Sequence, residues 1–330
     1  MIFSESTAKN NALFGEWDAP IKMLLESNEE ACRQNSIVEK LFHQEKSTHF
    51  GESYVAMTAM SEFEPVGENG AYPSAQMEQG YDKLIRNYEW KSRFAISQTM
   101  IEDGNIIDLR KQPTSFVKAY YRTRENYGAA MVGAAIQRAT SCTFKGKSFD
   151  ATCADGGALF SKAHTNKLTG TQQSNWFSNA LTQANLGKAE TAMQNFTGDA
   201  DEVLAVAPTV IVIPNDAALK EAAFSAVGSH DDPASSNNAW NYQYGRWSIW
   251  IWPYLNRFIT ANTAPWLLLD EAYNDAVGSL IWQDRVELTV KSIIDENTDA
   301  NVWKGRARFA AGFNDWRGIA LGGIASGTAL

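Results

Sequence analysis

Alternating apolar and polar side chains mark two extended segments within the first hundred residues. Residues 88–96 place Tyr88, Trp90, Phe94 and Ile96 on one parity, and Glu89, Lys91 and Arg93 on the other. An earlier segment places Val55, Met57, Ala59 and Phe63 on one parity. A period of two is typical of half-buried strands. Residues 64–80 lie between the segments without any period and contain three glycines and two prolines. The region therefore predicts a projecting β-hairpin with a long polar tip, whose exposed apolar face needs a partner.

Residues 1–50 have the pattern of an arm with two short helices. Asp18 is a suitable N-cap, and Pro20 is tolerated in a first helical turn. Apolar side chains follow at roughly helical spacing: Ile21, Leu24, Leu25, Ile37, Val38, Leu41 and Phe42. Residues 26–34 are polar and predict a break between the helices. Such an arm must lie on its own core or on a neighbouring subunit.

The longest helix is predicted at residues 113–140, where Pro113 opens it. Its apolar stripe consists of Phe116, Tyr120, Tyr127, Met131, Ala135 and Ile136. Gly128 and Gly133 each cost about 1 kcal/mol relative to alanine, so close packing against another element must hold this helix. A second helix is expected at residues 182–197, with Gly198 as its stop. Its inward-facing side chains are Leu186, Ala189, Met193 and Phe196.

Short apolar runs predict strands in the second half of the chain. Residues 208–214 form a β-branched run, and residues 203–206 form a related one before it. Asn215 is expected to cap a short helix ending near Val227, and residues 230–239 to form a polar loop. Further strands are expected at residues 247–252, 266–269 and 302–311. In the last, Trp303, Ala307 and Phe309 alternate with Lys304, Arg306 and Arg308. Strands and helices are partly segregated, so the predicted class is α+β.

Composition narrows the function without assigning one. The 330 residues are 44% hydrophobic and 20% charged, which is ordinary for a globular protein with a substantial core. A net charge of −9 argues against a dedicated nucleic-acid binder, and eleven tryptophans favour extensive packing or interfaces. No apolar run is long enough to span a membrane, so we expect a soluble protein.

The cysteines and histidines give no sign of an active site. Three cysteines without a CxxC pair fit free buried thiols in a reducing compartment. A pairing of Cys142 with Cys153, or a metal site that adds His164, is the less favoured alternative. The four histidines form no HxxxH or HxH pair. His164 can be placed beside Asp155 as a base, but a loop histidine that forms hydrogen bonds is the favoured interpretation.

Four further motifs are absent or fail in detail. No Walker-type loop, G-x-G-x-x-G or G-x-S-x-G motif is present, and residues 323–327 only imitate the last one with the wrong spacing. Residues 295–301 resemble half of a calcium loop, but Ala300 takes the glycine position and Arg306 the glutamate position. A turn that leads into the last strand is favoured. The sequence therefore predicts no catalytic, cofactor-binding or metal-binding residue, and no enzyme.

Three segments in order carry a resemblance to a known family: residues 158–170 (ALFSKAHTNKLTG), 208–214 (PTVIVIP) and 312–317 (GFNDWR). Their order and spacing resemble the Mu-like major head subunits of tailed bacteriophages, which share the Hong Kong 97 type capsid fold. The resemblance covers about residues 156–322. It implies that residues 182–196 form the second helix of a peripheral domain and that residues 210–227 enter an axial domain. Trp316 and Arg317 resemble the closing dipeptide of the last strand.

The resemblance implies a division of the whole chain into five parts. These are an N-terminal arm (1–50), an extended hairpin loop (51–104), a peripheral domain with its spine helix near 113–140 (105–207), an axial domain (208–290), and a closing strand with the C-terminal tail (291–330). The hairpin and the arm are expected to cross subunit boundaries, and residues 230–239 to surround a local symmetry axis.

The function implied by the resemblance is assembly. Copies are expected to form pentamers and hexamers and then an icosahedral head shell around double-stranded DNA, without sequence-specific binding. The resemblance also implies a virion location and assembly in the bacterial cytoplasm, without a membrane or a cofactor. The partners it implies are a separate scaffolding protein, a portal and decoration proteins.

The alternatives left open concern the cargo and the cations. An encapsulin-type nanocompartment shares the fold but packages enzymes. Lys304, Arg306 and Arg308 can meet DNA phosphates, solvent or acids of another subunit. Lys83 and Lys91 resemble the hairpin lysines that crosslink some capsids of this fold, but we predict no crosslink.

Overall fold

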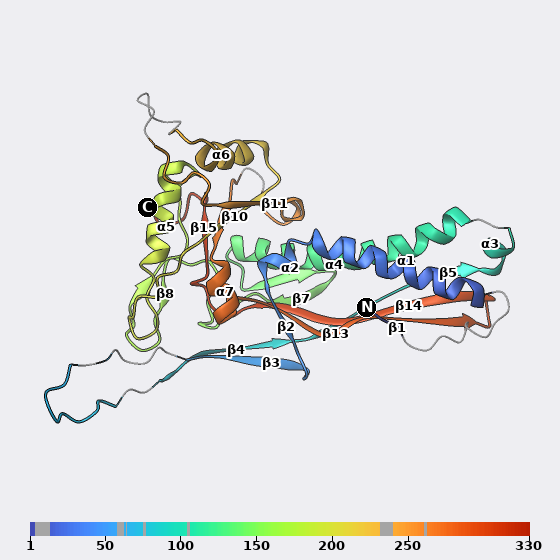
Figure 1. Ribbon diagram of the computed structural model, residues 1–330, viewed down its shortest axis with the longest axis horizontal. Helices are drawn as coiled ribbons and strands as arrows, with labels where there is room; N and C mark the ends of the chain where they lie inside the picture. Colours follow the sequence, from blue (N-terminus) through green and yellow to red (C-terminus); the bar gives the residue numbers. More distant parts are fainter. Residues whose placement is uncertain are drawn as a thin grey trace. The chain divides into compact units, whose positions relative to one another are not determined.

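The computed structural model describes residues 1–3, 14–57, 63, 65–74, 77–103, 106–231, 240–260 and 263–330 (Figure 1). Two compact units divide the chain. Unit 1 comprises Met1–Glu52, Ile85–Gly128 and Trp282–Ala311, and unit 2 comprises Ser53–Leu84, Ala129–Ile281 and Gly312–Leu330. Each unit therefore combines segments that are far apart in the sequence.

The sheet of unit 1 runs in the order β1 (Ile2–Phe3), β13 (Leu280–Asp295), β14 (Ala300–Phe313) and β5 (Tyr88–Ser97), and β2 (His43–Lys46) also pairs with β13. β5 lies antiparallel to β14 over ten residue pairs, from Ala300 opposite Ser97 to Phe309 opposite Tyr88. The predicted pairing of β5 with the segment at residues 55–63 is wrong. Alternation shows which face of a strand is buried, but it does not identify the neighbouring strand.

The hairpin instead pairs β3 (Gly51–Met57) with β4 (Gln79–Arg86). Its returning strand, β4, was not predicted. Ala59 lies outside the described residues, and Phe63 is fully exposed. The described residues of the predicted tip, 65–74 and 77–78, have no regular secondary structure and are exposed, as expected for a polar loop.

Unit 1 has two helices in its arm, as predicted, and two more later in the described part of the chain. They are α1 (Gly15–Gln34), α2 (Val38–Leu41), α3 (Gln98–Glu102) and α4 (Ile106–Ile136), which continues into unit 2 after Gly128. Residues 26–34 belong to α1, so the predicted break is wrong. Their polar side chains lie largely on the solvent side of a continuous helix, where pairs such as Gln34 and Glu30 join successive turns.

Two predicted helix starts are also wrong. Asp18 is not a cap but a buried residue inside α1, where its carboxylate accepts a hydrogen bond from Lys22 at 2.6 Å. Pro113 lies inside α4, which begins seven residues earlier at Ile106. The close approach predicted for the helix glycines is confirmed. A Cβ on Gly128 would lie 2.6 Å from Val38 Cγ2, and one on Gly133 would lie 2.5 Å from Phe258 Cβ.

The core of unit 1 lies between its helices and one face of its sheet (Figure 1). The buried cluster draws on α1, α4, β5, β13 and β14: Ile21, Leu25, Ile96, Phe116, Val117, Tyr121, Leu288, Val290 and Trp303. Gly305 on β14 leaves room for Phe116, because a Cβ there would lie 2.3 Å from Phe116 Cζ. We call this helix-covered side the inner face of the sheet and the opposite side the outer face.

Unit 2 is built on a four-stranded sheet in the order β11 (Ser248–Trp252), β10 (Val210–Pro214), β12 (Trp266–Leu269) and β15 (Ile319–Gly322). β10 is parallel to β11 and antiparallel to β12, and every residue of β10, β12 and β15 is buried. Three of these strands confirm predicted apolar runs. Residues 203–206 form no strand; Val203 makes an isolated bridge to Thr197, and Ala205 adopts a positive φ of 51°.

The remaining elements of unit 2 surround this sheet. Two short hairpins join β6 (Ser141–Phe144) to β7 (Lys147–Asp150) and β8 (His164–Thr165) to β9 (Gln172–Gln173). The helices are α5 (Gln183–Gln194), α6 (Ala217–Gly228), α7 (Glu271–Val277) and the 3-10 helix η2 (Pro253–Arg257).

Helix α5 is confirmed, with Thr182 as the N-cap and all four predicted inward side chains buried, but it ends at Gln194 with Asn195 as its C-cap and not at Gly198. Asp216, not Asn215, caps α6, since its Oδ1 accepts from Leu219 N at 2.9 Å. Of the predicted polar loop, residues 232–239 lie outside the described residues.

Candidate functional site

His164 and Asp155 meet, as the less favoured base hypothesis requires, but in a buried place. His164 Nδ1 lies 2.6 Å from an Asp155 carboxylate oxygen, and the ring stacks on Trp316 with centroids 4.4 Å apart. Nε2 lies 3.2 Å from both the Leu159 carbonyl and Asn175 Oδ1. The imidazole is 1% exposed. Both ring nitrogens are therefore occupied by protein groups, and the histidine holds the loop together.

Arg317 is the centre of a second buried network in unit 2. Its guanidinium contacts Asp199 at 2.8 Å, Asp315 at 3.2 Å and Asn166 Oδ1 at 3.1 Å, and Nε donates to the Thr197 carbonyl. Burial alone would lower the pKa of Arg317, but the two carboxylates outweigh it and raise the pKa. The network joins two of the segments that carry the family resemblance, residues 158–170 and 312–317, so these motifs serve the fold of unit 2.

Cys142 and Cys153 are buried free thiols, as predicted, whereas Cys32 is free but only half-buried. Burial raises the pKa of Cys142 to about 11 and that of Cys153 well above its ordinary value. Cys153 Sγ donates to the Asn314 carbonyl at 3.4 Å. Within the described part of the chain, no group of three or more histidine, cysteine or carboxylate side chains is placed to hold a metal ion.

The segment that resembles half a calcium loop is the turn between β13 and β14, as predicted. Asn297 N donates to Asp295 Oδ1 at 3.1 Å within this turn. Arg306, which takes the place of the bidentate glutamate of a calcium loop, pairs with Glu89 on β5.

Strand β4 of the hairpin is fastened to the rest of unit 2. Lys83 is buried and donates to Asp150 at 2.7 Å and to Thr152 at 2.6 Å. Lys167 Nζ donates to the Gly80 carbonyl at 2.5 Å, and Tyr81 donates to the Thr165 carbonyl at 3.1 Å. These contacts hold β4 up to the end that adjoins the loop.

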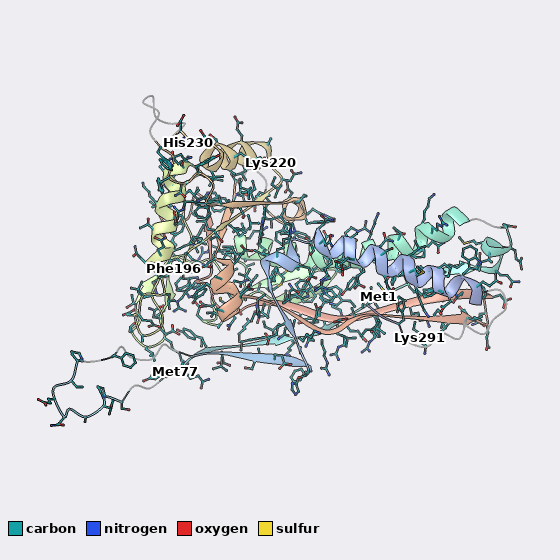
Figure 2. All side chains as sticks on the ribbon, in the orientation of Figure 1. Met1, Met77, Phe196, Lys220, His230 and Lys291 are labelled. Carbon is teal, nitrogen blue, oxygen red and sulfur yellow. The ribbon has the colours of Figure 1, made fainter. Side chains whose placement is uncertain are left out.

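The loop of this hairpin exposes apolar side chains. We define the hairpin loop as residues 65–74, which Figure 1 shows beyond the ends of β3 and β4. Tyr72 is 99% exposed and Val66 53% exposed. Phe63 just before the loop is also exposed, and so is Met77 just after it, which Figure 2 labels. Apolar groups gathered on one extended segment are typical of a surface that another molecule covers.

A second exposed group is aromatic and lies at the turn that follows α6. Trp240, Tyr242 and Tyr244 are 72%, 56% and 47% exposed, and His230 stacks on Trp240 with centroids 5.4 Å apart (Figure 2). Buried Asn241 holds the turn by donating to the Ala226 and Ser229 carbonyls. An aromatic surface on a fixed turn therefore directly follows the predicted polar loop.

The outer face of the unit 1 sheet forms a basic groove of about 610 Å³. We define the basic groove by its five cations: Lys91, Arg93, Lys291, Lys304 and Arg306. All five are exposed, and Lys291 is labelled in Figure 2. The outward direction predicted for Lys304 and Arg306 is confirmed, whereas Arg308 is half-buried opposite Glu89. Hydrogen bonds from Arg306 and then Lys91 lower the pKa of Glu89.

Sequence reasoning missed Lys291, because β13 was not predicted as a strand. Its alternation of Glu287, Thr289 and Lys291 with buried Leu288 and Val290 was a usable signal.

None of the described helices is long and apolar enough to cross a membrane.

Comparison with known proteins gives one family and one fold. A family model described as phage capsid protein matches residues 81–322. No curated protein matches the sequence. The solved capsid of Ralstonia phage GP4 has a TM-score of 0.55 at 10% identity, over 88% of this chain and 91% of that chain.

Two other solved structures are similar to this chain. Mycobacterium phage Patience has a TM-score of 0.50 at 13% identity, over 97% of this chain and 90% of that chain. Microbacterium phage Oxtober96 has a TM-score of 0.50 at 12% identity, over 88% of this chain and 90% of that chain. At these identities the likeness shows the fold alone.

Proposed function

The chain belongs to the phage capsid protein family, and from that premise we propose that it is the major head subunit of a tailed phage, related to the Mu-like head subunits. Copies assemble through pentamers and hexamers into an icosahedral head around double-stranded DNA. The family makes the chain a structural component of a virion shell, with the mixed α and β fold of Hong Kong 97 type capsids and a non-enzymatic role. A phage capsid family also favours a phage head over an encapsulin-type compartment.

The observation that supports assembly most directly is the exposed hairpin loop. A folded unit gains nothing from holding Phe63 and Tyr72 in water, since each aromatic side chain can bury roughly 150–250 Å² against a partner. Strand β4 of the hairpin is held by buried Lys83 and by Lys167, so the loop is presented from a fixed position. We infer that the loop lies over an adjacent subunit in the shell.

We propose domain roles within the shell as follows. Residues 1–50 are the arm, 51–104 the extended hairpin region, and 105–207 the peripheral domain with its spine helix. Residues 208–290 are the axial domain, and 291–330 the closing strand with the tail. The aromatic turn at Trp240–Tyr244 has a surface suited to contacts around a local symmetry axis. Scaffolding, portal and decoration proteins are its expected partners, and the bacterial cytoplasm is the expected place of assembly.

Electron microscopy of the purified chain tests this function, together with size-exclusion chromatography. We expect shells, tubes, pentamers or hexamers from the chain alone or after co-expression with a scaffolding protein. A species that stays at the 36.5 kDa of one chain under both conditions would contradict the proposal. Enzyme cargo in place of DNA in particles from infected cells would support the encapsulin alternative.

A further inference from the structure

The basic groove carries positive charge that unit 1 leaves largely unneutralised. Glu89 pairs with both Lys91, at 3.0 Å, and Arg306, so one carboxylate serves two cations. In the described part of the chain, Arg93, Lys291 and Lys304 form no ion pair. Exposed cations are common, but five around one groove with a single shared carboxylate are a concentrated field.

The strand register makes this arrangement unfavourable within one chain. Lys304 lies directly opposite Arg93, and Arg306 lies directly opposite Lys91. Like charges that face each other across a strand pair destabilise it. An acid at any one of these positions would relieve the repulsion. The arrangement therefore has a natural explanation if an anionic partner covers the groove.

The groove also suits apolar contact. Lysine and arginine side chains keep their aliphatic stems on the protein surface while their charges reach outward. Gly305 lies between Lys304 and Arg306 and lines the groove with its backbone alone, because its side-chain position faces Phe116 on the inner face. The result is a hollow with an aliphatic lining and a cationic rim, which matches a partner that is both apolar and acidic.

The chain itself contains such a partner. Residues 58–78 include four glutamates and no lysine, arginine or histidine. The described part of this segment exposes Phe63, Val66, Tyr72 and Met77. We propose that the basic groove receives the hairpin loop of a second copy of this chain. Glu68 neutralises the cations around Arg93 and Lys304, and Val66 and Tyr72 pack on the aliphatic stems.

This inference rests on the proposed function, because a shell brings copies into repeated contact. Groove and loop are different surfaces, so the contact is heterologous and can continue from copy to copy until a ring closes. Each copy supplies one groove and one loop, so all grooves and all loops are matched. The hairpin loop thereby gains a specific receptor.

A nucleic-acid backbone is the competing occupant, and the charge balance disfavours it. The chain carries 38 acidic against 29 basic residues, so its overall field repels a polyanion. Five cations neutralise few phosphates, whereas the segment at residues 58–78, which carries the hairpin loop, has four glutamates and matches them closely in number.

Charge reversal and charge exchange test the inference. The groove variant is Arg93→Glu with Lys304→Glu, and the loop variant is Glu64→Lys with Glu68→Lys. Each alone is expected to raise the concentration needed for assembly at least about tenfold, because like charges then face each other across the interface. The chain with all four changes is expected to recover assembly. The control is Lys147→Glu with Lys188→Glu, which reverses two exposed lysines outside the groove and should leave assembly unchanged.

Crosslinking then shows which copies are in contact. Glu68→Cys in one preparation and Arg93→Cys in a second, of different tag length, are mixed, assembled and oxidised. We expect a disulfide-linked dimer of one long and one short chain, which neither preparation forms alone. The unsubstituted chain, in which Cys32 is half-buried and Cys142 and Cys153 are buried, gives the background.

The outcomes separate this inference from the proposed function. If the unsubstituted chain never assembles, the proposed function fails. If it assembles, but the groove variant assembles equally well and no mixed dimer forms, this inference alone is overturned. Normal assembly of the groove variant with loss of bound nucleic acid would overturn it in favour of a phosphate backbone.

Discussion

The two faces of the unit 1 sheet differ in how their side chains pack and in how their charges are paired. On the inner face Phe94 stacks on Trp303, and Phe116 of α4 packs against the position of Gly305. Arg124 of α4 also lies on this side, fully buried and paired with Glu39 at 2.7 Å and Asp284 at 2.8 Å. On the outer face cations oppose cations, and Glu89 alone is shared between two of them.

The difference separates what stabilises the subunit from what prepares it for a partner. Burial alone would lower the pKa of Arg124, yet Tyr120 and the carboxylates raise it, because a buried charge must be compensated within the chain. The outer face leaves its charge uncompensated because water screens it until assembly. Substitutions on the inner face should therefore change folding, and those on the outer face should change association.

Trp303→Ala tests the inner face and should have the largest effect. The indole is fully buried in the core cluster, so its removal should lower the free energy of unfolding by about 3–5 kcal/mol. Urea denaturation of unassembled protein, followed by circular dichroism, measures this loss. The neighbouring Lys304→Ala should change the same quantity by no more than about 0.5 kcal/mol. Equal effects from the two substitutions would remove the distinction between the faces.

Arg124→Ala tests whether the buried cation is needed for folding. The change leaves Asp284 and Glu39 without their buried partner and should lower the free energy of unfolding by about 3–5 kcal/mol. The same denaturation measurement applies. Arg122→Ala, which removes an exposed arginine from the same helix, is the matched control and should have little effect. A neutral Arg124→Ala would mean that the ion cluster contributes nothing to the subunit.

Lys304→Glu tests the outer face and should change stability in the opposite direction. The new carboxylate lies opposite Arg93, so a repulsive pair becomes an attractive one. We expect the free energy of unfolding of the isolated chain to rise by about 0.2–1 kcal/mol, while assembly weakens. A loss of folding stability together with normal assembly would contradict both parts of this account.

A pH series on Glu89 tests the smallest effect. Hydrogen bonds from Arg306 and Lys91 lower its pKa from the ordinary value of 4.5, so the charged carboxylate stabilises the folded chain above that pH. The contribution is lost as pH falls below 4.5 and the group takes up a proton. The urea midpoints of wild type and Glu89→Gln should therefore differ at pH 7 and converge in acid. A constant difference between pH 7 and pH 3 would show that the carboxylate charge is unimportant.

The sequence predicted which face of a strand is buried more reliably than which strands pair with each other. Alternation correctly placed Trp303, Ala307 and Phe309 inward and Lys304 outward, because it reflects burial of one side of a strand. It could not pair β5 with β14, since about 200 residues separate them and no local pattern encodes the match. The basic groove depends on that pairing, which brings Lys91 and Arg93 to Lys304 and Arg306.

Local chemistry explains the smaller errors. Asn215 and Asp216 are both good N-caps, and only the backbone geometry selects Asp216. Residues 26–34 lack apolar positions because that part of α1 is largely solvated, so the apolar spacing stopped before the helix did. The complete burial of His164 was equally invisible, since its partners Asp155, Leu159 and Asn175 come together only in the folded loop.

A cryo-electron microscopy map of assembled particles tests the central claim most directly. The account predicts that the hairpin loop of one copy lies over β5 and β14 of the next, with Glu68 among the cations of the basic groove. An outer face open to solvent, or covered by nucleic acid, would contradict it.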